Sequence, residues 1–316
     1  MVWPWSSPKT VLSSPSERLF PLLQTRCEDP IPTSAAVHES CPCGETADRQ
    51  LRWRRTAVKQ DQRAPFVRAL ERARLSAYPP GEFVGQESFM RAGEIRALAR
   101  RAGIAPGVSV LDLCCGVAGP GRFITQELGC TYLGVDFSSS ALQIAREKAG
   151  DLPCRFQVWR IPPIPRGPFD VVLLLETMLA FPEKETLLQE ISLALTTAGR
   201  FAFTLEEGTP LTEAERRRMP DADTVWLTPL QEMLDCLARA GLVVRWQVDC
   251  SRSHRAVAES LINAFAADAA DIAAQIGRRA LEELLAGHRL WSNWLREGRV
   301  RKIAFVAEKS ETTAAE

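Results

Sequence analysis

The sequence lacks an excess of charge of either sign. Its 316 residues include 39 lysines and arginines against 39 aspartates and glutamates, so the formal net charge at neutral pH is zero. Proteins that bind polyanions usually present a positive field, and a neutral chain would need a local basic patch instead. We therefore expect no nucleic-acid partner for this chain.

Long apolar runs are also missing. The longest ones, such as residues 171–175, are far shorter than the ~20 residues that a helix needs to cross a bilayer. The N-terminal stretch MVWPWSSPKT has no basic segment followed by an apolar core, which a secretory signal requires. These absences predict a cytoplasmic protein without a membrane span.

A disulfide framework and a metal motif are absent as well. The nine cysteines are odd in number and scattered along the chain, which favours reduced thiols. Cys41 and Cys43 lie near His38 and downstream of Cys27, but their C-x-C spacing lacks the usual paired C-x₂-C ligands of zinc. The sequence therefore predicts no metal site.

The N-terminal part of the chain differs from the rest. Residues 1–60 are rich in Pro and Ser and show no apolar period, which predicts a disordered extension. Residues 49–74 are basic and have two interpretations, an arm that binds nucleic acid or a solvated helix leading into the domain. Aromatic residues do not alternate with these charges, which favours the solvated helix.

From residue 88 onward, helical and strand patterns alternate. Such alternation predicts a doubly wound, Rossmann-like α/β fold with a seven-stranded, mostly parallel sheet. The predicted helices are 88–101, 120–128, 138–149, 183–195 and 228–240; the predicted strands are 108–113, 131–136, 155–158, 169–175, 200–205, 242–248 and 301–307.

An alanine-rich helical stretch, residues 251–295, interrupts the alternation before the last strand. We therefore expect a core domain with N-terminal helices over residues 61–250, a helical lid over 251–298, and the last core strand within 299–309. The lid carries apolar residues at helical spacing, which are more often core than cavity wall: Phe265, Leu284, Leu285, Trp291 and Trp294.

A glycine-rich loop follows the first strand, in the stretch VLDLCCGVAGPGRF at residues 110–123. In a doubly wound sheet this loop lies at the ligand crevice, and glycines such as Gly116 and Gly119 let a ligand approach the backbone. Asp136 ends the second strand and can bind a ribose diol, which both a dinucleotide and S-adenosylmethionine offer. Asp112 would repel a pyrophosphate but attract an ammonium group, so the loop favours S-adenosylmethionine.

These stretches resemble a known superfamily. VLDLCCGVAGPGRF and YLGVDFSSSALQIAREKA resemble the first two motifs of class I S-adenosylmethionine-dependent methyltransferases, while FDVVLLLETMLAF and TTAGRFAFT resemble its fourth- and fifth-strand motifs. The resemblance implies that Asp112, Gly116 and Gly119 line the methionine end of the cofactor, where Cys114 stands in place of a motif glycine. It further implies that Asp136 binds the ribose and Phe137 lies beside the adenine. Glu176 would lie near the sulfonium.

Two further residues are candidates for the cofactor site. The family often places an acid after the third strand to bind the adenine amino group, but this chain reads RFQVWRIPPIP there. Trp159 either stacks on the adenine or is a packed aromatic plug. Gln86 can hydrogen-bond the cofactor carboxylate or the acceptor.

Missing motifs narrow the reaction. The chain has LLETML where methyltransferases of nucleobases and glutamine carry an Asn/Asp-Pro-Pro-aromatic motif, and it lacks grouped carboxylates for Mg²⁺. The helical insertion resembles that of cyclopropane-fatty-acid synthases and mycolic-acid methyltransferases. The resemblance implies a small organic acceptor (a natural product, a lipid or an amine), with oligomeric state and methylation at O, N or C left open.

A hydroxyl or an activated carbon acceptor would need a general base. The candidates are His254, which follows the sixth strand, and Glu176 and Glu206, which end strands at the crevice. Two alternative functions remain at this stage: an NAD(P)-dependent oxidoreductase, and a catalytically silent binding protein with a methyltransferase-like fold.

Overall fold

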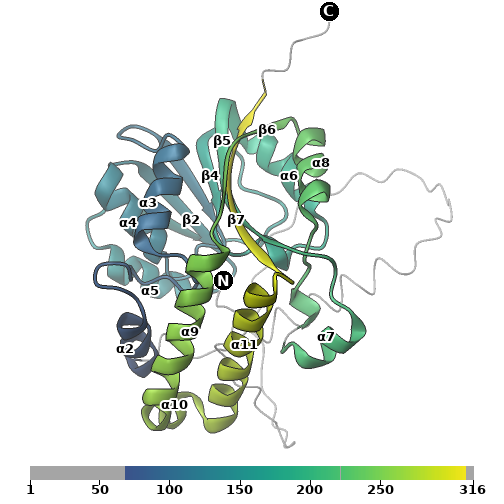
Figure 1. Cartoon of the computed structure of the whole chain (residues 1–316). Coiled ribbons are helices and arrows are strands. Elements are labelled where there is room, and N and C mark those ends of the chain that lie inside the picture. Colours follow the sequence, from purple (N-terminus) through teal and green to yellow (C-terminus); the bar gives the residue numbers. More distant parts are fainter. Residues whose placement is uncertain (1–67, 221, 311–316) are drawn as a thin grey trace, which may run out of the picture. The chain divides into compact units, whose positions relative to one another are not determined.

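The structure is a computed structural model that describes residues 68–220 and 222–310, all within one compact unit (Figure 1). Seven strands form one sheet in the order β3-β2-β1-β4-β5-β7-β6, and only β7 is antiparallel to its neighbours. The strands are β1 (Ser109–Leu113), β2 (Thr131–Asp136), β3 (Cys154–Val158), β4 (Phe169–Leu174), β5 (Leu195–Glu207), β6 (Leu242–Asp249) and β7 (Arg301–Lys309). The predicted fold class is confirmed.

Helices cover both faces of the sheet because strand residues alternate between two apolar clusters. Val110 and Val171 pack under the helices on one face, whereas Leu111 and Val172 pack under those on the other. The first face is covered by α3 (Ala92–Arg101), α4 (Gly119–Leu128) and α5 (Ser139–Ala149), and the second by α6 (Lys184–Ala194) and α8 (Leu230–Arg239).

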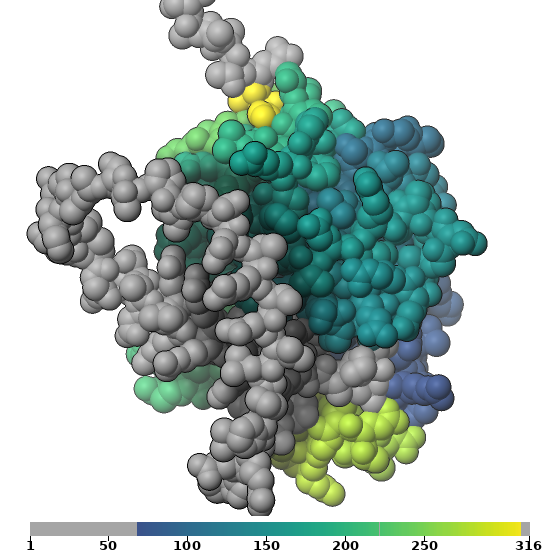
Figure 2. All heavy atoms as spheres, turned by 180° about the vertical axis from the view of Figure 1, so that it is seen from behind, coloured from purple at the N-terminus to yellow at the C-terminus, as the bar shows by residue number. Residues whose placement is uncertain are grey.

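A third apolar cluster forms a helical layer beside the sheet. It joins α2 (Arg68–Ala77), α9 (Ser251–Ala267), α10 (Ala269–Ile276) and α11 (Arg278–Glu297). In Figure 2, α2 in purple-blue and the α10 region in yellow-green lie at the same end of the molecule, below the teal strands and helices. Three short elements lie at its border: η1 (Met178–Ala180), which follows β4, and α7 (Glu213–Arg218) and η2 (Ala222–Thr224), which lie between β5 and α8.

Several boundaries differ from the sequence prediction. The helix expected from residue 88 begins at Ala92, and residues 251–295 form three helices rather than one stretch, broken at Asp268 and Gly277. Gly277 has a left-handed φ of 87°, which ends the regular helix there. The fifth strand extends to Leu195–Glu207: Leu195 pairs with Phe169 of β4 at one end, and the residues up to Glu207 pair with β7 at the other.

The basic segment before the domain is not a solvated helix where the structure describes it. Ala69, Leu70 and Ala73 of α2 are buried against α9, and Arg74 pairs with Glu87 in the interior. The prediction failed because charge was counted without the apolar i, i+3, i+4 stripe between the arginines. The predicted extension over residues 1–60 lies outside the described residues, and no described helix is long and apolar enough to span a membrane.

Gly119 is required for packing between two backbone segments. A Cβ atom there would lie 2.4 Å from the backbone carbon and oxygen of Gly85. Residues 82–86 therefore contact the start of α4 directly, which brings this segment to the end of β1. The glycine in the loop motif builds one wall of the site.

Replacing Gly119 with alanine should destabilise the protein by about 1–3 kcal/mol, because two backbone segments would have to separate. Gly93→Ala in α3 is the matched control: its Cβ would meet the flexible end of Glu82 at 3.3 Å, so we expect little change or a gain of up to ~1 kcal/mol. Urea unfolding measures both. Equal stabilities of the two variants would contradict this account of the loop.

Candidate active site

The site lies where the strand order reverses, between β1 and β4. A cavity of about 490 Å³ opens at the carboxyl ends of these strands, and a segment before α3 closes it from above. Its lining comprises Gly85, Gln86, Glu87, Ser88, Asp112, Cys114, Cys115, Gly116, Val117, Gly119, Pro120, Leu175, Glu176 and Thr177. Six residues predicted from the sequence are among them: Gln86, Asp112, Cys114, Gly116, Gly119 and Glu176.

The loop after β1 turns through three left-handed residues. Cys114, Gly116 and Ala118 have φ values of 57°, 55° and 54°, and two of the three are not glycine. Such positions persist only where the surroundings enforce them, and they cluster at ligand sites. The thiol of Cys114, which stands in place of a motif glycine, has its pKa raised to about 12 by burial, so it is neutral and lines the cavity as a small apolar group.

Asp112 is the buried acid at the mouth of β1. Its Oδ2 accepts a hydrogen bond of 2.6 Å from the hydroxyl of Tyr132, and Gly121 leaves room for that ring, since a Cβ there would lie 2.2 Å from it. Burial raises the pKa of Asp112 to about 7, although the Tyr132 hydroxyl lowers it. A cation bound beside this carboxylate would return the pKa toward its ordinary range.

Asp136, at the end of β2, organises the loop from within. Its Oδ2 accepts from the backbone N–H of Gly116 at 3.0 Å, and its Oδ1 accepts from that of Ser138 at 2.9 Å. The residue does not line the cavity, so its contact with a ribose stays a prediction.

The two aromatic residues expected at the adenine have protein partners. The guanidinium of Arg160 lies 5.5 Å from the centroid of the Phe137 ring. The indole N–H of Trp159 donates to the carbonyl of Pro163 at 2.7 Å, and its ring packs on the sheet core. This arrangement fits the packed plug, and stacking on an adenine remains a prediction for both rings.

Gln86 braces the segment that covers the cavity. Its amide nitrogen donates to the carbonyls of Glu82 and Met90, and its oxygen accepts from the N–H of Val84. Both amide hydrogens are thus used within the segment. Gln86 shapes the cavity wall. Its side-chain amide has no hydrogen left to donate to a cofactor carboxylate, the contact predicted from the sequence.

Glu176 sits just beyond β4 in a left-handed conformation, with φ of 56°. Its Oε2 lies 2.7 Å from the ammonium of Lys302, whose other contact at 2.7 Å is Oε1 of Glu206. β7 is antiparallel, so its first residues reach the same sheet edge, where Lys302 is the register partner of Glu206. All three side chains are buried.

The pKa values of the two glutamates that share this lysine shift in opposite directions. Burial acts to raise the pKa of Glu176, but Lys302 and His254 together bring it below its usual range. Burial raises the pKa of Glu206, and Lys302 offsets this only in part. Glu176 therefore faces the cavity as a carboxylate, whereas Glu206 lies behind Lys302 and does not line it.

His254, the first candidate base, lines neither this cavity nor the second one described below. Its Nε2 lies 3.4 Å from Oε2 of Glu94, and its Nδ1 lies 3.8 Å from Oε1 of Glu176. The ring is buried in the first turn of α9, at the seam between α3 and the sheet edge. It can act on a substrate only through Glu176.

A second cavity of about 330 Å³ continues from the first under the helical layer. It shares Gln86, Glu87 and Ser88 with the first cavity and adds Arg74, Tyr78, Phe89, Leu261, Leu284 and His288. Of the lid residues singled out in the sequence, Leu284 lines this cavity, while Phe265, Trp291 and Trp294 belong to the helical core.

Two polar features interrupt this apolar wall. Arg74 and Glu87 form a buried ion pair of 3.0 Å. Burial lowers the pKa of His288 to about 4, so the ring is neutral, and its Nδ1–H donates to the carbonyl of Leu284 at 2.8 Å. The Nε2 of His288 is then the nitrogen with a lone pair to accept a hydrogen bond.

Sequence reasoning missed Lys302, His288 and the wall from Glu87 to Phe89. Lys302 carried a signal, because it is a charged residue that opens the otherwise apolar stretch IAFVA at the crevice end of the last strand.

Comparison with known proteins agrees with this architecture. Residues 110–199 match a family model described as a methyltransferase domain. This stretch of the core therefore resembles a methyltransferase domain. The resemblance found in its sequence motifs is thereby confirmed, and neither alternative function finds support among these matches.

The relatives of this methyltransferase domain match it only in part. The methyltransferase GfsG of Streptomyces halstedii is 26% identical over 116 residues, 34% of this chain and 40% of that protein. The sterol 24-C-methyltransferase of Eremothecium gossypii is 31% identical over 131 residues, 39% of this chain and 35% of that protein. The chain thus spans less than half the length of either relative.

Solved structures share the fold over a longer range. The cyclopropane synthase MmaA2 of Mycobacterium tuberculosis superposes with a TM-score of 0.67 at 13% identity, covering 77% of this chain and 95% of that structure. This likeness shows the fold alone.

Replacing Lys302 with methionine should destabilise the methyltransferase domain by about 3–5 kcal/mol, because two buried acids would lose their shared counter-charge. The double variant Lys302→Met/Glu206→Gln should recover part of this loss, since it removes one of the unpaired acids. Lys309→Met is the control, because Lys309 is in the same strand and donates only to the carbonyl of Leu195. Thermal or urea unfolding that ranks Lys302→Met with the control would contradict the account.

Proposed function

We propose that this protein is an S-adenosylmethionine-dependent methyltransferase that acts on a small, mainly apolar organic molecule. The observation that carries the proposal is a pair of buried carboxylates, Asp112 and Glu176, in one cavity at the switch point of a class I methyltransferase sheet. A ligand with two separate positive charges, an ammonium and a sulfonium, matches that pair.

The residues present fit this cofactor. Burial raises the pKa of the Asp112 carboxyl, and an ammonium bound beside the carboxylate would lower this pKa. Lys302 favours the carboxylate form of Glu176, which also contacts the backbone of Phe89, a residue that lines the second cavity. The cofactor, when bound, supplies an electrophilic methyl group.

The protein's own part in the reaction is alignment and exclusion of water. The methyl group passes in line from the sulfonium to the acceptor atom, which forms the new bond as the carbon–sulfur bond breaks. Gln86, Glu87 and Ser88 line both cavities, so this segment meets the acceptor and the cofactor at once. Such orientation can supply several kcal/mol of barrier reduction.

The second cavity is the proposed acceptor site. Its wall combines Tyr78, Phe89, Leu261 and Leu284 with the neutral ring of His288, which suits an apolar molecule carrying one hydrogen-bond donor. If that donor is a hydroxyl that is methylated, its proton needs a base. Of the sequence candidates, Glu176 is the one that lines a cavity, and methylation at O, N or C remains open.

We further propose a cytoplasmic protein without a nucleic-acid partner. The compartment is carried over as an expectation from the sequence, and the absence of a nucleic-acid partner is supported by the zero net charge.

Calorimetry with S-adenosylmethionine and with NAD tests the cofactor, and formation of S-adenosylhomocysteine with a panel of apolar alcohols, amines and alkenes tests turnover. Binding of NAD in preference to S-adenosylmethionine, or cofactor binding with no product from any acceptor class, would contradict the proposal.

Leu284→Trp should fill the acceptor cavity and reduce turnover at least about tenfold, or about 1.4 kcal/mol, with little change in cofactor affinity. Leu285→Trp, on the adjacent and less buried position of the same helix, is the matched control. Loss of cofactor binding in Leu284→Trp alone would show that the two cavities have been assigned wrongly.

The affinity for S-adenosylhomocysteine should depend on the protonation of Asp112. Its carboxyl has a pKa of about 7 before the ligand binds, so it is neutral below that pH and cannot hold an ammonium. We expect Kd to rise about tenfold for each pH unit below 7. Calorimetry between pH 5.5 and 7.5 measures this.

Asp112→Asn should bind weakly and without this pH dependence. Asp151→Asn, at an exposed position before β3, should behave as the unmodified protein. A pH-independent Kd for the unmodified protein would contradict the assigned role of Asp112.

A further inference from the structure

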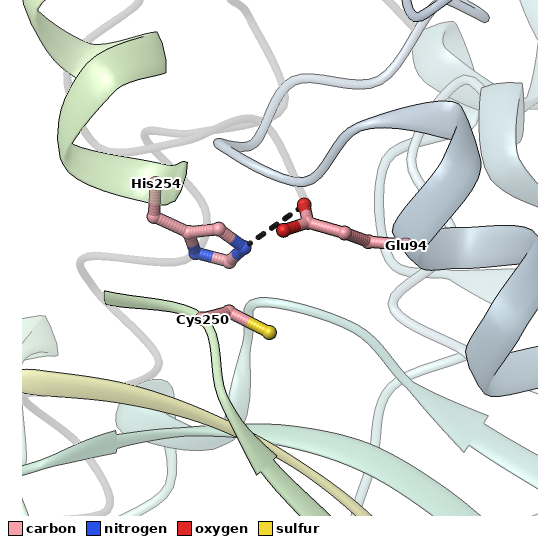
Figure 3. Close-up of side chains that lie close together, drawn as sticks. All are labelled: Glu94, Cys250 and His254. Carbon is pink, nitrogen blue, oxygen red and sulfur yellow. Dashed lines mark ion pairs between the residues drawn. The ribbon is translucent and has the colours of Figure 1, made fainter. Parts of the chain in front are cut away.

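Three potential metal ligands converge at the seam between α3 and α9. Cys250 and His254 are four residues apart at the start of α9 and share one face of its first turn. Glu94 comes from the first turn of α3. Figure 3 shows the imidazole edge directed at the carboxylate of Glu94, with the sulfur of Cys250 beside them, and one ligand atom from each residue lies within 4.8 Å of the others.

The contact between His254 and Glu94 is longer than a typical hydrogen bond. The Nε2 of His254 lies 3.4 Å from Oε2 of Glu94, whereas a charge-assisted hydrogen bond is about 2.7–2.9 Å. Two ligands of one tetrahedral Zn²⁺, with bonds of about 2.0–2.2 Å, lie about 3.3–3.5 Å apart. The sulfur would complete the set after a shift of about 1 Å, which a cysteine side chain can make.

A second observation is the burial of this histidine. The ring of His254 is 1% exposed, yet its nitrogens make only the long ion-pair contacts of 3.4 Å and 3.8 Å with Glu94 and Glu176. Buried polar groups nearly always form hydrogen bonds of ordinary length, so the long contacts of this buried imidazole call for an explanation. A cation bound at Nε2 would explain these contacts.

The surroundings fit a metal-bound histidine. The other nitrogen, Nδ1, lies 3.8 Å from Oε1 of Glu176, an oxygen that also has no hydrogen-bond partner. Metal-bound histidines usually direct the second nitrogen at a carboxylate, which fixes the tautomer and the ring orientation. The remaining neighbours of Glu94 are the hydroxyl of Ser253, the N–H of Arg91 and the Arg91 guanidinium at 3.6 Å.

We propose that Glu94, Cys250 and His254 bind one Zn²⁺ ion, which joins the lid helix α9 to α3 beside the active site. Cys250 gives up its thiol proton to solvent as the sulfur–metal bond forms, so the site carries two negative charges that balance the ion. A water molecule takes the fourth position. The sequence had predicted no metal ligand, because these three residues come together only through the fold.

Cobalt titration of the full chain, stripped of metal with a chelator, tests this site independently of the methyltransferase reaction. We expect one Co²⁺ per chain, with visible bands of a tetrahedral ion and a near-ultraviolet thiolate band, all removed by Zn²⁺. Cys250→Ser should lose the thiolate band and at least about 100-fold in affinity. Glu94→Gln, which keeps the shape of the side chain, should also weaken binding.

Two controls separate this site from other thiols. Cys236→Ser changes a buried thiol on α8, and the triple variant Cys27→Ser/Cys41→Ser/Cys43→Ser removes the cysteines of the N-terminal segment. Both should bind Co²⁺ as the unmodified chain does, and Zn²⁺ should raise Tm in them but not in Glu94→Gln. Failure to bind one ion per chain, a thiolate band that survives Cys250→Ser, or one that disappears in the triple variant would each overturn the proposal.

Discussion

The ammonium of Lys302 is the interaction on which the site depends. It comes from the only antiparallel strand of the sheet and lies between a glutamate after β4 and one at the end of β5. Its position also brings it 5.5 Å from the ring centroid of Phe89 and 5.4 Å from that of Trp291, which belong to the cavity wall and the lid. One buried cation therefore joins the sheet edge to the helices that cover it.

This arrangement explains why the lid insertion precedes β7. The chain leaves β6, forms α9 to α11 over the site, and returns with Lys302 as the second residue of the last strand. The helical layer is thus anchored at both ends next to Glu176. Desolvation makes such a cluster costly unless each charge is paired, so the lid and the sheet edge must fold together.

The sequence was a good guide to the fold because strand and helix periods are local. The exits of β1 and β2, marked by Asp112 and Asp136, were placed correctly for the same reason. It was a poor guide to contacts: neither the hydrogen bonds that occupy Gln86 and Asp136 nor the burial of α2 can be deduced from spacing. His254 was expected to face the substrate, but a position after a strand does not tell on which side of the lid a ring will lie.

The central claim is that Asp112 binds the ammonium of the cofactor while Glu176 faces its reacting sulfur. A crystal structure with S-adenosylhomocysteine would measure both contacts in one experiment. We predict the ligand's amino nitrogen at about 3 Å from the Asp112 carboxylate and its sulfur toward Glu176, where the acceptor cavity begins. A ligand bound in the opposite direction, or with its amino group on any residue other than Asp112, would contradict the account.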